Sequence, residues 1–329
     1  MMGRVGCIDI GTVTCRLAVA DVSEGRIRHL SKRSTIVDVG EGLTATGVIG
    51  EPARQRLLAC IDGYLVDARE QATPVICCTL TSAARDASNS DVLLADLAAR
   101  GLEAQVIPGE VEGQLTLLGV CQDFPGRLVL AADNGGGSTE LALGRLSGTG
   151  LEAKAVRSVD VGCRRITDRF LMAGDPPFAA DLSAAHDFAA EPFNKAVAEL
   201  GLREAGAERL VVTGGTVTSL VAIKARLVPY DSKYVHLHEL TYKEVEELEG
   251  LLAKLTVEER MQLPGLQSKR ARVILGGVVA VTELMRATGL DRLTVSESDL
   301  LHGLALTVDA VCTAGASPVM WEPKLARLV

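Results

Sequence analysis

The segment Asp133-Asn-Gly-Gly-Gly-Ser-Thr-Glu140 combines residue types that hold phosphate and a hard cation. Three consecutive glycines after an apolar run lose chain entropy and supply no packing atoms. Such a run commonly occurs where backbone N–H groups must come close to an anion. Asp133 ends the apolar run and is suited to bind a cation, with Glu140 as a second carboxylate nearby. The segment therefore predicts a phosphate-binding turn beside a metal site.

A second turn, Asp9-Ile-Gly-Thr-Val-Thr-Cys-Arg16, offers an acid, two hydroxyls and a guanidinium after another apolar run. The pattern Asp-x-Gly-Thr is a weak signal alone, because many turns contain it. Asp9 and Asp133 lie 124 residues apart, and each begins an Asp-x-Gly turn, which indicates a repeat at the domain scale. Coincidence is the alternative, since strand–turn–strand units are common. Two such turns facing each other across a cleft would clamp successive phosphates.

Three further segments place polar groups after apolar stretches. Arg85 is positioned to meet a phosphate, although a surface arginine on a solvated helix is the ordinary alternative. One acid of Gly109-Glu-Val-Glu-Gly113 is suited to act as general base for a water, or both acids simply complement a helix dipole. Gly215 and Thr216 form a turn suited to a phosphate or a nucleoside. The chain has no P-loop, zinc-protease or serine-hydrolase motif.

Short apolar strands alternate with helices between these segments. Residues 5–22 and 128–146 each predict strand, glycine turn and strand, and a helix is predicted from about Glu51. Aromatic residues make up only 3%, so the cores must be built from Ala, Val, Leu and Ile. That mixture suits strands that are buried on both faces under helices, which indicates an α/β fold.

The length of 329 residues predicts two domains, and the strand–turn–strand pattern restarts near residues 122–127. We therefore expect domains at 1–124 and 125–310. The tail, residues 311–329, is mostly non-periodic and is expected either to pack back on the first domain or to be loose.

The net charge of −8 argues against non-specific nucleic-acid binding. No apolar run reaches membrane-spanning length and no leader pattern is present, so we expect a cytoplasmic protein without a membrane partner. The eight cysteines never form a C-x-x-C pair and mostly lie in apolar runs, which predicts reduced, buried thiols. They are Cys7, Cys15, Cys60, Cys77, Cys78, Cys121, Cys163 and Cys312.

The order of these motifs resembles the exopolyphosphatase/guanosine pentaphosphate phosphatase (Ppx/GppA) family, in its short two-domain form. The resemblance extends from about residue 3 to 306 and is carried by DIGTVTCRL (9–17), TSAARDASN (81–89), PGEVEGQLTLLGV (108–120), DNGGGSTEL (133–141), VVTGGTVTSL (211–220), PGLQSKRARVILGG (264–277) and LTVSESDLLHG (293–303). It implies an actin-like ATPase (ribonuclease H-like) fold of two duplicated α/β domains with the active site in the cleft between them. It also implies a homodimer.

The resemblance implies Glu112 as the catalytic base and Arg85 as a catalytic, phosphate-binding arginine. It implies a Mg²⁺ site, with Mn²⁺ as the alternative ion, at Asp133; Glu140 and Asp9 are the further candidate ligands. The predicted phosphate-binding set is Gly11, Thr12, Val13, Thr14, Arg16, Gly135, Gly136, Gly137, Ser138, Thr139, Gly215 and Thr216.

Three positions depart from the family pattern, and the last two of them, Arg272 and Leu301, bear on substrate choice more than on chemistry. Val13 replaces an Asn, Arg272 replaces an Asp, and Leu301 replaces an Arg. The predicted function is magnesium-dependent release of terminal orthophosphate from inorganic polyphosphate by a Glu-activated water. The alternatives are a guanosine pentaphosphate 5′-phosphohydrolase, a small-metabolite kinase of the same fold, and a non-catalytic sensor of phosphate polymers or alarmones.

Overall fold

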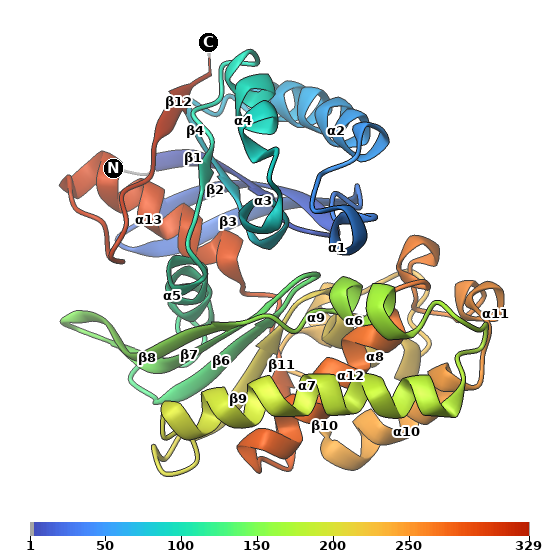
Figure 1. Ribbon diagram of the computed structural model, residues 1–329. Helices are drawn as coiled ribbons and strands as arrows, with labels where there is room; N and C mark the ends of the chain where they lie inside the picture. The colour runs from blue at the N-terminus through green and yellow to red at the C-terminus, as the bar shows by residue number, and fades with distance from the viewer. Residues whose placement is uncertain (1–2, 329) are drawn as a thin grey trace.

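The computed structural model describes residues 3–328 and contains two α/β lobes (Figure 1). The first sheet opens with an antiparallel meander of β1 (Gly3–Ile10), β2 (Thr14–Ser23) and β3 (Arg26–Ile36). β4 (Val75–Leu80) then pairs parallel with β1, and β5 (Gln105–Val106) pairs parallel with β4.

The second sheet repeats this order. β6 (Val129–Asn134), β7 (Thr139–Ser147) and β8 (Gly150–Val159) form the meander, and β9 (Arg209–Thr213) pairs parallel with β6. β11 (Arg292–Val295) and the edge strand β10 (Glu239–Thr241) complete the sheet. The domain-scale repeat that the sequence indicates is therefore confirmed in the topology.

The repeat also fixes equivalent positions in the two lobes. Asp9 lies opposite Arg16 and beside Thr79 in the first sheet, and Asp133 lies opposite Glu140 and beside Thr213 in the second. The same strand geometry thus carries an arginine in one lobe and a glutamate in the other.

Helices cover both faces of each sheet. α2 (Glu51–Glu70) and α4 (Ser90–Ala98) pack on the outer face of the first sheet, and α7 (Ala179–Glu199), α8 (Gly215–Lys224), α10 (Tyr242–Ala253) and α12 (Ile274–Thr288) pack on the outer face of the second. Two helices lie between the sheets, where α13 (Leu300–Ala314) packs on the first sheet and α5 (Gly109–Val120) packs on the second. Each lobe is thus covered by a helix that follows the other lobe's strands in the chain.

α5 and α13 cross in close contact. A Cβ atom on Gly303 would lie 1.8 Å from the Leu115 carbonyl oxygen, and one on Gly119 would lie 2.3 Å from the Asp299 carbonyl oxygen. Only glycine fits at these two positions, because any other residue would overlap the backbone of the facing helix.

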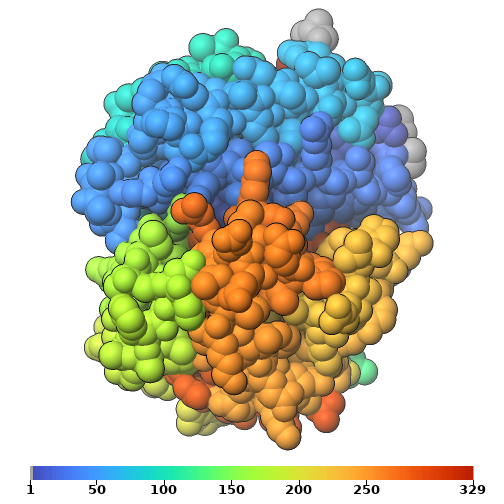
Figure 2. All heavy atoms as spheres, turned by 90° about the vertical axis from the view of Figure 1, so that its right-hand side faces the viewer, coloured from blue at the N-terminus to red at the C-terminus, as the bar shows by residue number. Residues whose placement is uncertain are grey.

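The remaining elements are short, and several of them border the lobe boundary. They are α1 (Leu43–Thr46), α3 (Ser82–Asp86), α6 (Cys163–Phe170), α9 (Ser232–Val235), α11 (Val257–Met261) and a 3₁₀ turn, η1 (Ser268–Arg270). Figure 2 shows the blue first lobe resting on green, orange and yellow segments of the second. After α13 the chain returns to the first sheet, where β12 (Leu325–Arg327) pairs antiparallel with β4. The boundaries at 124/125 and 310/311 stay a prediction.

None of the helices within residues 3–328 is both long and apolar enough to cross a membrane.

Candidate active site

The two glycine turns and the start of α5 meet at the boundary between the lobes. They enclose a cavity of about 60 Å³, whose wall is formed by Asp9, Gly11, Thr12, Val13, Thr14, Arg16, Thr81, Ser82, Glu112, Asp133, Asn134, Gly135, Gly136, Ser138, Cys163, Gly214, Gly215 and Arg270. A second cavity of about 760 Å³ adjoins it and shares five wall residues: Thr14, Arg16, Gly214, Gly215 and Arg270. The site is therefore a narrow chamber beside a wide one.

The glycines of the Asp133 turn are required by the approach of the other lobe. A Cβ atom on Gly136 would lie 2.7 Å from Thr12 Cβ, and one on Gly137 would lie 2.3 Å from Ser82 Oγ. Gly11 and Gly135 each close a turn through a backbone hydrogen bond. The N–H of Gly11 donates to the Thr14 carbonyl oxygen, and the N–H of Gly135 donates to the Ser138 carbonyl oxygen. The glycines thus bring the two turns together, in addition to any contact with an anion.

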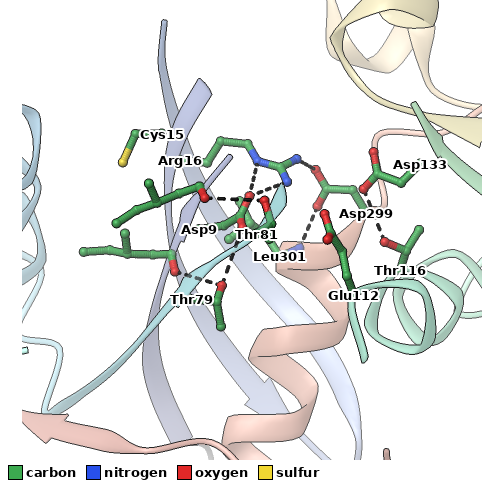
Figure 3. A network of polar contacts seen from close by, with 12 residues as sticks. Asp9, Cys15, Arg16, Thr79, Thr81, Glu112, Thr116, Asp133, Asp299 and Leu301 are labelled. Carbon is green, nitrogen blue, oxygen red and sulfur yellow. Dashed lines mark hydrogen bonds and ion pairs between the residues drawn. The ribbon is translucent and has the colours of Figure 1, made fainter. Parts of the chain in front are cut away.

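Arg16 lies at the centre of a buried charge network (Figure 3). Its Nε and Nη2 donate to Asp9 Oδ2 at 3.0 and 2.6 Å, and its Nη1 donates to Asp299 Oδ2 at 2.8 Å. Burial disfavours its charge, but Asp9, Asp299 and Asp133 outweigh burial and raise the pKa of Arg16. Burial also disfavours the charge on Asp299, yet Lys32 and Arg16 hold the pKa of Asp299 well below its usual value.

Glu112 and Arg85 form an ion pair beside this network. Arg85 Nη1 donates to Glu112 Oε2 at 2.8 Å and to the Ile107 carbonyl oxygen at 3.0 Å, while Nη2 reaches Glu140 Oε1 at 3.5 Å. Burial and the nearby charge of Glu140 raise the pKa of Glu112 well above its ordinary value, against the opposing effect of Arg85. Glu112 lies in the chamber wall with Asp9 and Asp133, and Arg85 fixes it from behind.

Asp133 and Glu140 suit a divalent cation that takes only one or two protein carboxylates, and they do not form a site in which protein side chains supply every ligand. Burial raises the pKa of Asp133 despite the opposing charge of Arg16, and burial followed by the charge of Asp133 raises the pKa of Glu140 to about 7. Glu140 Oε2 is buried without a hydrogen-bond partner. A cation bound between the two side chains would relieve the repulsion between the Asp133 and Glu140 carboxylates. Mg²⁺ commonly takes one or two carboxylates and completes its shell with water and substrate phosphate.

The third predicted ligand, Asp9, is already neutralised by Arg16 through a 2.6 Å ion pair. Accordingly, residues 3–328 contain no group of three or more His, Cys, Asp or Glu side chains arranged to hold a metal ion. Asp133 and Glu140 are therefore the two carboxylates of this set that are suited to hold a divalent cation, which would need further oxygen ligands from water or a bound anion.

Several predicted site residues lie outside the chamber wall. The Thr139 hydroxyl donates to the Val161 carbonyl oxygen at 2.6 Å and so anchors β7. Thr216 packs on α12, where a Cβ atom on Gly277 would lie 2.2 Å from its hydroxyl oxygen. Arg85 and Glu140 contact the wall residue Ser138 at 3.3 and 2.7 Å. Gly137 packs against Thr12 and Ser82 of the wall. The wall includes the other predicted residues: Asp9, Gly11, Thr12, Val13, Thr14, Arg16, Glu112, Asp133, Gly135, Gly136, Ser138 and Gly215.

Val13, where the family pattern has a carboxamide, contributes a contact between the lobes. It is buried against Cys163 and Val273 of the second lobe, and its carbonyl oxygen accepts backbone hydrogen bonds from Val37 and Asp38. The replacement therefore exchanges a polar side chain at the chamber for apolar packing across the lobe boundary.

Six residues of the chamber wall are absent from the sites assigned from sequence: Thr81, Ser82, Asn134, Cys163, Gly214 and Arg270. Asp299, which lines the wide cavity, is absent as well. Asp299 comes four residues after the apolar strand β11, whereas Asp9 and Asp133 are the penultimate residues of β1 and β6, so only a weaker form of the same signal marked Asp299. Arg270 carried no such signal, because it lies in a polar turn. It is only 9% exposed, lines both cavities and makes no side-chain hydrogen bond or ion pair within residues 3–328. Burial lowers the pKa of Arg270.

Comparisons with known proteins agree with this geometry. The model of the Ppx/GppA phosphatase family matches residues 18–308. Exopolyphosphatase 2 of Mycobacterium tuberculosis is 33% identical over 321 residues, which cover 93% of this chain and 98% of that protein.

Two solved structures share the whole architecture. An exopolyphosphatase from Cytophaga hutchinsonii is 26% identical with a TM-score of 0.82, covering 96% of this chain and 99% of its own. The Aquifex aeolicus Ppx/GppA family member is 27% identical with a TM-score of 0.77, covering 96% and 100%. Together with the duplicated sheets, these matches confirm the predicted α/β, actin-like ATPase fold.

Proposed function

Because the chain belongs to the Ppx/GppA phosphatase family and is a phosphoanhydride hydrolase, we propose that it releases terminal orthophosphate from inorganic polyphosphate with magnesium. The observation that carries the proposal is Glu112, a buried carboxylate with a raised pKa in the wall of the chamber between the two phosphate turns.

The two cavities suit removal of an end group. A chamber of about 60 Å³ is far smaller than the roughly 300–1,000 Å³ of sites that hold a drug-sized ligand. It has room for a terminal phosphoryl group, while the adjoining cavity of about 760 Å³ has room for the rest of the substrate, to which that group is attached. The proposed reaction therefore proceeds from a chain end.

Glu112 would take the proton of a water that attacks the terminal phosphorus. A raised pKa makes a carboxylate a stronger base, and Arg85 holds this one in a single orientation through their 2.8 Å contact. Phosphoryl transfer depends mainly on positioning and charge neutralisation. Here the backbone N–H groups of the glycine turns and the Arg16 side chain would position the phosphoryl group, and the guanidinium of Arg270, which makes no ion pair within residues 3–328, would neutralise its charge. When bound at Asp133 and Glu140, magnesium would neutralise charge on the phosphoryl oxygens.

Substitution of Glu112 tests the proposal directly. We expect Glu112→Gln to lower orthophosphate release from polyphosphate by about 10²- to 10⁴-fold, the usual contribution of a general base. Glu110→Gln is the matched control, because Glu110 is an exposed acid in the same turn of α5 and its loss should leave the rate unchanged. Thermal unfolding checks that both variants fold. Undiminished release by Glu112→Gln would exclude the assigned base.

A nucleotide substrate is the second candidate, and the wide cavity favours it. Beside its basic residues the cavity has an apolar wall of Leu227, Val228, Pro229 and Leu266, with Tyr230 next to them. Such a wall suits a nucleoside attached to the phosphates, as in guanosine pentaphosphate.

One panel of substrates separates the candidates. Orthophosphate release is compared for polyphosphates of several lengths and guanosine pentaphosphate, with magnesium, with manganese and with excess chelator. A higher kcat/KM for the nucleotide would reverse the order of the two candidates. ATP-dependent transfer to an acceptor would indicate a kinase, and tight binding without turnover a sensor. The homodimer and the cytoplasmic location stay predictions.

A further inference from the structure

The Asp133 turn, residues 135–138, rests on the start of α6, which lies on the side of the second lobe that faces the first (Figure 1). The backbone N–H of Cys163 donates to the Gly135 carbonyl oxygen at 3.0 Å. The N–H groups of Arg164 and Arg165 donate to the Gly136 carbonyl oxygen at 2.8 and 3.2 Å. The N–H groups in the first turn of a helix have no partner within that helix, and here the Asp133 turn supplies their acceptors.

The Arg165 side chain holds the next carbonyl of the same turn. Its Nε donates to the Gly137 carbonyl oxygen at 2.7 Å, and its Nη2 donates to Asp86 Oδ2 at 2.5 Å. Asp86 is the last residue of α3 in the first lobe, next to Arg85, which holds Glu112. A guanidinium is planar and its donors have fixed directions. One side chain therefore fixes a carbonyl of the second lobe against a helix of the first.

These contacts decide where the N–H groups of the turn point. In a trans peptide the N–H points opposite to the carbonyl that precedes it, and the peptides of this turn are trans. The carbonyls of residues 135–137 face α6 and the Arg165 guanidinium, so the N–H groups of residues 136–138 are directed away from α6. None of these three N–H groups donates a hydrogen bond within residues 3–328.

The side of the turn opposite α6 faces the first lobe and the chamber. A Cβ atom on Gly137 would lie 3.1 Å from Thr12 Oγ1, and Thr12, Gly136 and Ser138 all line the chamber wall. The Thr12 hydroxyl is buried and has no hydrogen-bond partner within the described chain. Successive backbone N–H groups on one side of a turn form a binding site for an anion. Under the proposed function, this anion is the terminal phosphoryl group.

We propose that Arg165 is a positioning residue for phosphate release. By holding the Gly137 carbonyl it keeps the Ser138 N–H directed at the terminal phosphoryl group, and Asp86 keeps the guanidinium in place. A hydrogen bond from a charged donor also polarises the peptide group, which makes its N–H a stronger donor. The effect on phosphate release rests on the proposed function, whereas the effect on binding of orthophosphate does not.

The test measures release from polyphosphate with magnesium and binding of orthophosphate by calorimetry, both with the full chain. We expect Arg165→Ala to lower kcat by about tenfold. This is less than the roughly 10²- to 10³-fold loss on removal of an oxyanion donor, because the Ser138 N–H remains but is no longer held. The Kd for orthophosphate should rise about fivefold, the contribution of one hydrogen bond. KM should change by less than about twofold, because the wide cavity still binds the rest of the substrate.

Asp86→Ala tests the second contact of the guanidinium. We expect this variant to lower kcat less than Arg165→Ala does, because the bond from Nε to the turn remains. The combined variant should be no slower than Arg165→Ala alone, since both substitutions act through the same side chain. Independent, multiplying losses would contradict the role given to Asp86.

Arg164→Ala is the matched control for the lobe boundary. The Arg164 side chain also joins the lobes, through Asp38 at 3.1 Å, and within residues 3–328 it bonds only Asp38 and Asp168. Its loss should lower the unfolding temperature at least as much as Arg165→Ala does, while kcat and the Kd for orthophosphate change by less than about twofold.

Three results would overturn the proposal. Equal losses of kcat in the Arg164 and Arg165 variants would show that a loosened lobe boundary, not the turn, slows release. An unchanged Kd and kcat in Arg165→Ala would exclude the positioning role, and so would failure of the unsubstituted protein to bind orthophosphate. If the unsubstituted protein binds orthophosphate but releases none from any substrate in the panel, the proposed function fails, and the comparison of Kd values still decides whether Arg165 orients the turn.

Discussion

At the scale of single residues, Arg270 is the least compensated charge in the site. Its guanidinium is pressed against Gly215, where a Cβ atom would lie 2.2 Å from the arginine Cζ, and it makes no polar side-chain contact within the described chain. A buried charge without a partner destabilises a fold. Arg270 lines both cavities, so under the proposed function a substrate phosphate would be its partner.

We expect Arg270→Gln to raise the KM for polyphosphate by about tenfold or more, the loss of one charge-assisted contact, with a smaller change in kcat. Because the substitution removes an unpaired buried charge, the unfolding temperature of the substrate-free protein should not fall. Arg272→Gln is the control, since Arg272 is an exposed arginine two residues further on. Equal kinetic effects of the two substitutions would show that general surface charge, not Arg270, attracts the substrate.

The individual site residues were predictable where a local pattern marks them. Asp9 and Asp133 each end an apolar strand before a glycine turn, and Glu112 and Arg85 became informative through the family order of motifs. The orientation of Thr139 and Thr216 was not predictable, because whether a hydroxyl faces a chamber or a neighbouring helix depends on tertiary packing. Arg270 was missed for the same reason.

At the scale of elements, His186 joins three helices on the outer face of the second sheet. Its Nδ1 contacts Glu283 of α12 at 2.7 Å and its Nε2 contacts Glu249 of α10 at 2.8 Å, while His186 itself belongs to α7. Hydrogen bonds that the His186 ring N–H groups donate to Glu249 and Glu283 raise the pKa of His186 from 6.5 to about 9. The imidazolium therefore links the helices across the neutral pH range.

We expect His186→Ala to lower the free energy of unfolding by about 2 kcal/mol at pH 6.5, the order of two charge-assisted hydrogen bonds to a partly buried group. Folding raises this pKa, so the stabilisation is complete below about pH 6.5 and is lost as the pH rises through about 9. Denaturant unfolding at several pH values measures the difference from the unsubstituted protein. His29→Ala, at an exposed histidine, should show no such difference. A gap that stays constant up to pH 10 would contradict the ionic link.

The positions of strands and helices were easier to predict from sequence than the packing of distant elements against one another. The strand–turn–strand units at 5–22 and 128–146 and the helix from Glu51 are present as predicted, because hydrophobic periodicity and glycine turns act locally. No local pattern shows that α5 packs on the sheet formed later in the chain, or that β12 pairs with β4. Such pairings between distant segments are decided by burial in the folded protein.

At the scale of the whole molecule, the crossing of α5 and α13 sets the relation of the lobes. Asp299, which caps α13, also holds Arg16 at 2.8 Å and Lys32 at 2.7 Å. A change in the crossing would therefore alter the site as well as the stability.

We expect Gly303→Ala to destabilise the protein by about 3 kcal/mol and to lower kcat, because its methyl group would overlap the Leu115 carbonyl oxygen. Gly63→Ala is the matched control. Gly63 is an exposed glycine inside α2 with nothing within 4 Å of its Cβ position, so alanine should stabilise the protein by about 0.5–1 kcal/mol. Thermal or denaturant unfolding with phosphate release measures both. Equal stability changes in the two variants would contradict the required close crossing.

Because α5 packs on the second sheet and α13 packs on the first, we expect that neither lobe can be separated from the other and still fold. A truncation or recombination break between them would expose an apolar helix face on one piece and the matching apolar sheet face on the other. Each piece would then be a source of aggregation and not an independent domain. We therefore expect that another protein can be fused to this one only at its N- or C-terminus, with both lobes kept together.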